Sequence, residues 1–368
     1  MRFKSILLVS WVNFLLNTAV MGSMIFISLL GARLGASDFQ VGVIGATYGL
    51  SYLLSSIYSG RQSDRRGKLR FVRVGLLLCT VSFAAQLLAS NLIILALVRA
   101  GVGLSLGITM AALVAYAFES GADMGKFSSY GSLGWIAGSL TSAGLKEFHY
   151  IFVVGALSCA TAFLLSLFFA PETGPTSHQE SKTSLRFGAV VKRGFPIYLA
   201  VFFRHLGATS VWVILPLYFT SLGLGPFWLG ILWGTNFTVQ FIVMRYLDRF
   251  NPHRAFAIGQ IVSIMVFVAY VILKPVWPLL IAQALLGVAW ACLYVGALLL
   301  ILQAGEDRGT ASGIFQAVLN FCATVGPFLG GLIAQGWGYR GVFFFAAALG
   351  VAGMAVAVPQ TIQRSEGV

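Results

Sequence analysis

One short loop and two isolated arginines carry the residues of this chain that could do chemistry. The loop, residues 60–70, reads GRQSDRRGKLR and holds five basic residues and one acid, Asp64. An aspartate can pair with arginine and with the exposed N–H groups of a helix end, which is the chemistry of a breakable latch. Arg99 and Arg204 lie inside long apolar runs, where a cation needs a partner or a water-filled cavity. A guanidinium in a cavity could bind a negatively charged or electron-rich group.

The elements that position these residues are membrane-spanning helices. Of the 368 residues, 58% are hydrophobic and 10% are charged, and the mean hydropathy is +0.88. Apolar runs of about 20 residues can cross a ~30 Å hydrocarbon layer as helices, whereas strands of a membrane barrel would alternate in polarity. We therefore predict an all-α polytopic membrane protein with twelve spans. The spans are residues 6–30, 41–59, 74–89, 92–118, 127–145, 150–170, 195–222, 227–246, 255–273, 276–303, 311–335 and 341–358.

The cysteines and glycines inside these runs indicate helix packing rather than a reactive or metal-binding site. The four cysteines show no paired spacing, so we predict neither a disulfide, nor a metal site, nor a cofactor. Glycine pairs four residues apart, at 103 and 107, 134 and 138, and 326 and 330, indicate helices that approach closely. The first run is too long for a signal peptide and is predicted to be a permanent span.

The basic residues behind the net charge of +13 are distributed as expected for a membrane protein. With the N-terminus in the cytoplasm, eighteen of the 24 basic residues fall on the cytoplasmic side and four outside. This distribution places both termini in the cytoplasm by the positive-inside rule. We therefore predict a multi-pass monomer in the lipid bilayer of the cell (inner or plasma) membrane, with no nucleic-acid partner.

A polar stretch, residues 171–194, divides the spans six and six. Its first part, PETGPTS, predicts a cytoplasmic linker, and its second, SLRFGAVVKRG, could form an amphipathic helix at the membrane surface. The predicted domains are therefore six-helix bundles over residues 1–170 and 195–368. A shift of 184 residues superposes Arg61, Asp64 and Arg65 on Arg245, Asp248 and Arg249, and such internal repeats are typical of secondary transporters.

The loop resembles the signature of the major facilitator superfamily, Gly-x-x-x-Asp-Arg-x-Gly-Arg/Lys, found between the second and third helices. Here GRQSDRRGK stands in that loop, MRYLDRF after the eighth run is a degenerate second copy, and RAGVG at residues 99–103 resembles the fourth-helix motif. With twelve spans in two halves, the resemblance covers essentially the whole chain. It implies a rocker-switch transporter whose first, fourth, seventh and tenth helices line a cavity.

Two roles stay open for the loop: a gate between the halves, or an ordinary basic turn that sets topology. Gly60 and Gly67 would allow a close backbone approach or a positive φ. Glu119, at the inner end of the fourth run, is either a partner for Arg65 or a boundary residue. The gating candidates are Gly60, Asp64, Arg65, Gly67, Lys68, Glu119, Asp248 and Arg249.

Candidate substrate-binding residues lie on the four runs that the resemblance assigns to the cavity. They are Arg204, Arg99, Asn13, Asn17, Gln283, Trp290 and Tyr294. Arg204 lies ~14 Å into its run at 1.5 Å per residue, close to the midplane. Arg99 could instead bond between helices, the asparagines could join helices, and His205 either packs in an interface or is a proton-coupling candidate.

We therefore predict a secondary active transporter, a permease that works by alternating access on a small organic solute. Efflux is slightly favoured, and coupling to a proton or another ion is expected. Because no acid reaches mid-membrane while two arginines do, the predicted solute is anionic or neutral and polar. The alternatives are a transporter-like sensor or scaffold and a polytopic membrane enzyme, although no His/Asp/Cys constellation indicates enzyme activity.

Overall fold

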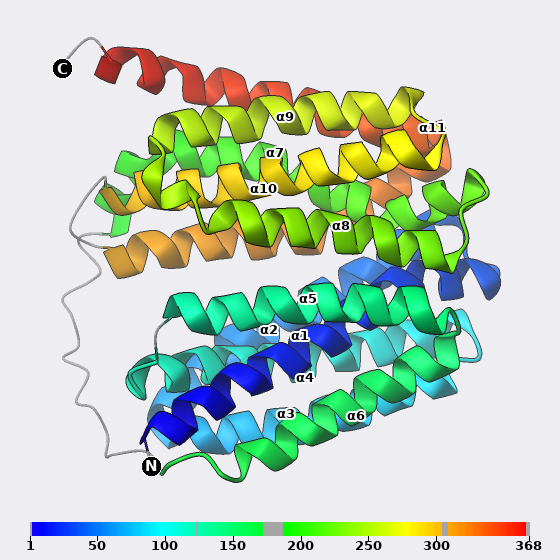
Figure 1. The fold of residues 1–368 in the computed structure, drawn as a ribbon, viewed down its shortest axis with the longest axis vertical. Helices are drawn as coiled ribbons and strands as arrows, with labels where there is room; N and C mark the ends of the chain where they lie inside the picture. The colour runs from blue at the N-terminus through cyan, green and yellow to red at the C-terminus, as the bar shows by residue number, and fades with distance from the viewer. Residues whose placement is uncertain (1, 123, 172–186, 304–307, 366–368) are drawn as a thin grey trace. The chain divides into compact units, whose positions relative to one another are not determined.

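The computed structural model describes residues 2–122, 124–171, 187–303 and 308–365, and within these ranges it contains helices and no strand (Figure 1). The all-α prediction is therefore confirmed. The α-helices are α1 (Arg2–Arg33), α2 (Asp38–Arg66), α3 (Lys68–Ala85), α4 (Leu92–Glu119), α5 (Met124–Leu145), α6 (Phe148–Ser166), α7 (Phe187–Ser221), α8 (Pro226–Met244), α9 (Pro252–Ile272), α10 (Val276–Gln303) and α11 (Arg308–Ser365). The described ranges also contain the short 3-10 helices η1 (Gln86–Leu88) and η3 (Leu247–Arg249).

Each predicted span overlaps one of these helices, and the last two share α11. Ten helical segments of the described ranges are long and apolar enough to cross a membrane, and one of them, Ala311–Ala357, covers both of the last two spans. Gly338 interrupts α11 with φ 69 and ψ 177, so α11 is two helices joined at a kink. The Gly- and Ser-rich α5 is not among the ten. With α5 added and α11 divided, the helices match the twelve predicted spans.

Polar residues fix several helix starts. Ser37 and Gln40 form a reciprocal capping box at the start of α2, which satisfies backbone N–H groups that the helix leaves without a partner. The Asn91 side chain accepts from the backbone N–H of Ile94 at the start of α4. Asn251 caps α9, and Pro252 occupies the first turn, where a missing N–H is tolerated.

The chain forms two compact units. Unit 1 comprises Met1–Pro175 and Val213–Phe237, and unit 2 comprises Thr176–Trp212 and Thr238–Val368. The boundaries cross α7 and α8, so the C-terminal part of α7 and the N-terminal part of α8 belong to unit 1. Within unit 1, Ser28 Oγ on α1 donates to the carbonyl oxygen of Val213 at 2.8 Å.

Close packing of small residues holds unit 1 together. Its most extensive helix pairs are α2 with α4 and α1 with α5. A Cβ at Gly103 or Gly107 of α4 would overlap the backbone of α2, and one at Gly134 or Gly138 of α5 would overlap that of α1. In unit 2, a Cβ at Gly330 of α11 would meet the backbone of Ser210 on α7. The predicted role of these glycine pairs in helix packing is confirmed.

Unit 2 packs around α7, α9, α10 and α11. Its core includes Tyr198, Phe256 and Phe315, each at most 5% exposed. The helix α7 begins at Phe187, and Val190 packs into this core at 8% exposure. Residues 187–194 of the stretch predicted as linker are thus the first turns of α7, and the side chain of Val190 anchors them to the core. Residues 172–186 of that stretch lie outside the described residues.

Candidate functional site

The charged loop at residues 60–70 is the junction of α2 and α3 in unit 1. The helix α2 continues through Arg66, and Gly67 makes the turn with φ 92 before α3 begins at Lys68. L-residues with a side chain rarely adopt this conformation, so the turn requires glycine at this position. Gly60 instead lies inside α2, where a Cβ would meet no atom within 4 Å. The expectation that Gly60 supplies a positive φ or a close approach is wrong, because the helix extends beyond the apolar run.

An ion pair between a buried lysine and a partly exposed glutamate joins this turn to the end of α4. Lys68 Nζ lies 2.7 Å from Glu119 Oε1, with the two side chains 6% and 31% exposed. The sequence leaves Glu119 as either a partner of Arg65 or a boundary residue, whereas the structure places Lys68 beside it. The reason is the position of the turn: Arg65 precedes Gly67 and stays on the exposed part of α2, while Lys68 opens α3, which packs on α4.

The gating set contains two further acids besides Glu119. The side chains of Asp64 and Asp248 lie outside the described residues. Arg249, in the 3-10 helix η3, is exposed. The structure therefore describes the basic members of both motif copies and the Lys68–Glu119 pair, and the gating role stays a prediction.

Arg99 lies in the α2–α4 interface of unit 1. Its side chain is 5% exposed, and its guanidinium carbon lies 4.5 Å from the centre of the Tyr48 ring on α2. This geometry is a cation–π contact. The Nε atom has no hydrogen-bond partner among the described residues. Arg99 thus joins two helices through a ring rather than through a carboxylate.

Asn13 and Asn17 join α1 to α5. Asn13 Nδ2 donates to the carbonyl oxygen of Phe127 at 2.8 Å, and Asn17 Nδ2 donates to Asn13 Oδ1 at 2.9 Å. Trp135 Nε1 on α5 donates to Asn17 Oδ1 at 2.7 Å and completes a chain of hydrogen bonds. These contacts are those of residues that hold helices together. A role of the asparagines in binding stays a prediction.

Arg204 is the largest fully buried side chain of the described residues, at 1% exposure. Its Nε donates to Ser263 Oγ on α9 at 2.9 Å. Its guanidinium carbon lies 5.3 Å from the ring centre of Trp290 on α10 and 5.9 Å from that of Phe267 on α9. The stretches 187–247, 249–305 and 308–365 contain no aspartate or glutamate, so α7 to α11 offer this cation no carboxylate.

A column of rings connects Arg204 to a more open part of unit 2. The His205 ring stacks on Trp290 with centres 4.9 Å apart, and Trp290 packs 5.5 Å from Tyr294. The Tyr294 hydroxyl accepts from Gln316 Nε2 at 3.1 Å, where Gln316 is exposed. His205 is 6% exposed, and Gln283 of α10 is fully buried. The structure therefore brings four candidates of unit 2 together: Arg204, His205, Trp290 and Tyr294.

Sequence reasoning did not select several side chains that contact these candidates. Tyr48, Trp135 and Ser263 lie in the second, fifth and ninth spans and hold Arg99, Asn17 and Arg204 respectively. A polar or amphipathic side chain inside an apolar run is the signal that could have found them, since such groups usually seek a partner in the membrane. The pairing itself depends on tertiary contacts.

The sequence matches the family model described as Major Facilitator Superfamily over residues 6–303 and 197–366. Multidrug resistance protein MdtG of Salmonella paratyphi A and that of Salmonella choleraesuis are each 25% identical over 378 residues, which covers 95% of this chain and 93% of the relative. These alignments extend over nearly the full length of both proteins.

Solved structures agree on the fold. The crystal structure of the nucleoside transporter NupG aligns with a TM-score of 0.78 at 15% identity, over 96% of this chain and 98% of that one. A bacterial homolog of the human lysosomal transporter Spinster, in an inward-facing and unoccupied conformation, aligns with a TM-score of 0.74 at 14% identity, over 97% and 95%. The chain belongs to the major facilitator superfamily, and it is an integral membrane transporter of the plasma membrane rather than an enzyme.

Proposed function

We propose that this transporter is a secondary active permease that moves a small organic solute by alternating access. Family membership along the whole chain supports the mechanism, since such folds expose one central site to each side in turn. Export is the favoured direction because the curated relatives carry the name multidrug resistance protein. Coupling to a proton or another ion would supply the driving force, and His205 is the coupling candidate. Residues 1–170 and 195–368 are the two proposed moving halves.

The proposed solute is anionic or neutral and polar. One observation carries this preference: Arg204 is a buried guanidinium in a set of helices, α7 to α11, whose sequence contains no carboxylate. At an effective dielectric constant of about 20, a unit charge about 8 Å from such a cation interacts with it by roughly 2 kcal/mol. This interaction is attractive for an anion and repulsive for a cation, so it separates the two classes of solute.

The proposed contact surface in unit 2 is the column of Tyr294 and Trp290. Tyr294 is partly exposed, and the ring of Trp290 lies against the Arg204 guanidinium. Arg204 itself is 1% exposed, and its Nε donates to Ser263, so a direct contact with solute would require the side chains that cover the guanidinium to move. Behind the rings, the guanidinium would still give this surface a positive potential. Arg99, Asn13, Asn17 and Gln283 are the further binding candidates.

A flux assay tests the function. The purified chain would be reconstituted into liposomes, and solutes that binding stabilises in a thermal-shift screen would be offered as matched anionic, neutral and cationic analogues. We expect accumulation driven by an imposed proton or sodium gradient, with the anionic and neutral analogues preferred. Gradient-independent equilibration would contradict secondary active transport, and preferred transport of the cationic analogues would contradict the proposed solute class.

The proposed orientation has a separate test. Both termini are placed in the cytoplasm, which puts the α2–α3 turn inside and the α9–α10 turn outside. Single cysteines at Arg70 and Lys274, both exposed, report these two turns. We expect a membrane-impermeant maleimide to label Lys274→Cys but not Arg70→Cys in intact cells. Labelling of both positions from the same side would contradict the topology.

A further inference from the structure

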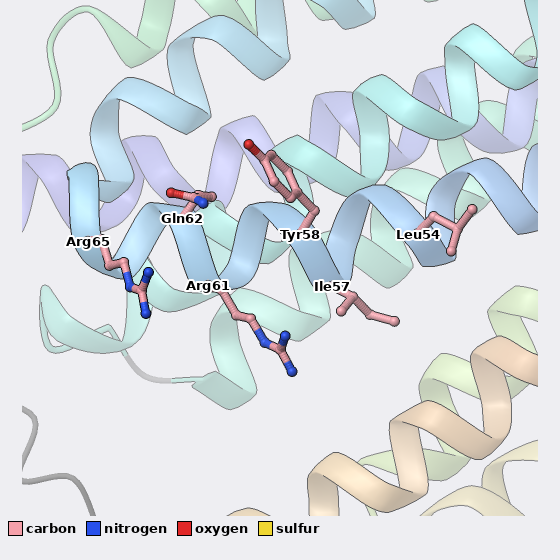
Figure 2. Close-up of a pocket in the computed structure, with 6 residues that line it drawn as sticks. All are labelled: Leu54, Ile57, Tyr58, Arg61, Gln62 and Arg65. Atoms are coloured by element: carbon pink, nitrogen blue, oxygen red, sulfur yellow. The ribbon is translucent and has the colours of Figure 1, made fainter.

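A groove of about 410 Å³ runs along one face of α2 (Figure 2). Its described lining residues come from that helix: Leu54, Ile57, Tyr58, Arg61, Gln62 and Arg65. Figure 2 shows the side chains of Ile57, Arg61 and Arg65 pointing to the same side of the helix. The candidate solute contacts on α1, α4, α7 and α10 do not include any of these residues.

The groove has an apolar part and a basic part. Leu54, Ile57 and Tyr58 are 60%, 52% and 62% exposed, and Leu50, at 48%, continues the same face by one turn. Positions three, four and seven apart on a helix share one face, so these side chains form a continuous apolar strip. The strip ends at Arg61 and Arg65, both exposed, at the end of α2.

Arg61 and Arg65 lie four residues apart and carry like charges. Such a pair destabilises a helix by roughly 0.2–0.5 kcal/mol unless an anion lies between its members. Among the described side chains, the ion pair of this region is formed by Lys68 and Glu119, and it includes neither arginine. Two neighbouring guanidinium groups offer several N–H donors in a geometry that suits a phosphate.

We infer that this groove binds an anionic phospholipid. The phosphate lies between Arg61 and Arg65, and an acyl chain follows Tyr58, Ile57, Leu54 and Leu50. From Arg61 to Leu50 the helix rises ~16 Å at 1.5 Å per residue, which is close to half of the ~30 Å hydrocarbon layer. The groove therefore matches one leaflet of the bilayer in both length and polarity.

The apolar strip selects a lipid over a free anion. A soluble phosphate would use the two arginines alone and would leave three large exposed side chains without a role. A lipid places its chain where these side chains are and its charge where the arginines are. Basic residues next to apolar helix surfaces attract anionic headgroups by about 1 kcal/mol for each residue.

The full-length chain in detergent tests this inference through lipid retention, which does not depend on any transported solute. Phosphatidylglycerol and phosphatidylcholine with identical acyl chains would be titrated, and bound lipid counted by native mass spectrometry. The test variant is Arg61→Gln with Arg65→Gln. The matched control is Arg66→Gln with Arg70→Gln, which removes the same charge from two exposed positions outside the groove.

We expect phosphatidylglycerol to bind the native chain more tightly than phosphatidylcholine. The test variant should lose about thirtyfold in phosphatidylglycerol affinity, which corresponds to ~1 kcal/mol for each arginine, while the control variant keeps the native affinity. Equal affinity for the two lipids would overturn the inference, and so would an equal loss in both variants. Displacement of the lipid by an equal concentration of glycerol phosphate would identify the groove as a free-anion site instead.

Discussion

Lys68 in unit 1 and Arg204 in unit 2 are both buried cations, yet their surroundings differ in kind. Lys68 opens α3 and lies 2.7 Å from the carboxylate of Glu119. Arg204 lies in the middle of α7, and its described contacts are one hydroxyl and two aromatic rings. The first cation is neutralised by a neighbouring carboxylate. The second is stabilised by groups that leave its charge in place.

We infer from this difference that the charge of Lys68 is structural, whereas the charge of Arg204 can act on a solute. An intramembrane arginine costs ~2.5–3.5 kcal/mol on insertion scales. A hydrogen bond from a charged group contributes ~1.5–3 kcal/mol, and a desolvated cation–π contact about 2 kcal/mol, so the Arg204 contacts offset that cost without cancelling the charge. We therefore expect loss of the paired cation or its partner to lower stability, and loss of the buried arginine to change which solutes are moved.

The largest effect is expected at the turn that holds the paired cation. Asp64→Asn should lower flux by about tenfold to a hundredfold, since a hydrogen bond to a charged group contributes ~1.5–3 kcal/mol to the proposed closed state. Solute binding and membrane insertion should persist. Flux in proteoliposomes at matched protein amounts measures the effect, and Asp38→Asn, at the other end of α2, is the control. Native flux in the Asp64 variant would contradict the gating role and would show that the loop is an ordinary basic turn that sets topology.

A smaller effect is expected when the paired cation loses its carboxylate. Glu119→Gln removes the negative charge beside Lys68 and should lower the free energy of unfolding by about 1–3 kcal/mol. Because Glu119 is partly exposed, we expect a value near the lower end of that range. The midpoint of thermal unfolding in detergent measures this change. Glu147→Gln, an exposed acid at the start of α6, should leave the midpoint unchanged. Equal midpoints for both variants would show that the Lys68–Glu119 pair contributes nothing to stability.

The smallest effect is expected at the second buried arginine. Arg99 is held by a cation–π contact with Tyr48, which contributes about 0.5–2 kcal/mol. Arg99→Gln and Tyr48→Leu should therefore lower the unfolding midpoint by similar small amounts, whereas Tyr48→Phe, which keeps the ring, should not. Anion flux should fall less in Arg99→Gln than in Arg204→Gln. Equal reductions would show that Arg99 acts on the solute as Arg204 does, and would contradict a purely structural role for Arg99.

Much of the fold could be predicted because apolar runs and glycine spacing are local properties of the sequence. The limits of α2 could not, since the helix continues for seven residues after the apolar run, six of them polar or charged, and the turn lies at Gly67. That displacement explains why Glu119 meets Lys68 rather than Arg65. The partner of Arg204, Ser263, is 59 residues away in the chain, and only tertiary packing brings the two together. The exposed face of α2 could not be predicted either, because apolar residues occur on all sides of that helix in the sequence.

The most direct test of the central claim is the ratio of anion to cation flux in three variants of unit 2. Arg204→Gln removes the charge, Arg204→Lys keeps it, and Ser263→Ala removes the hydrogen bond while leaving the charge in place. Matched anionic and cationic analogues in proteoliposomes would give the ratio for each variant and for the native chain. We expect Arg204→Gln to lower the ratio by about tenfold or more, given the roughly 2 kcal/mol interaction with a unit charge, while the other two variants stay near the native value. A ratio that is unchanged in Arg204→Gln, in a variant that unfolds at the native temperature, would contradict the claim.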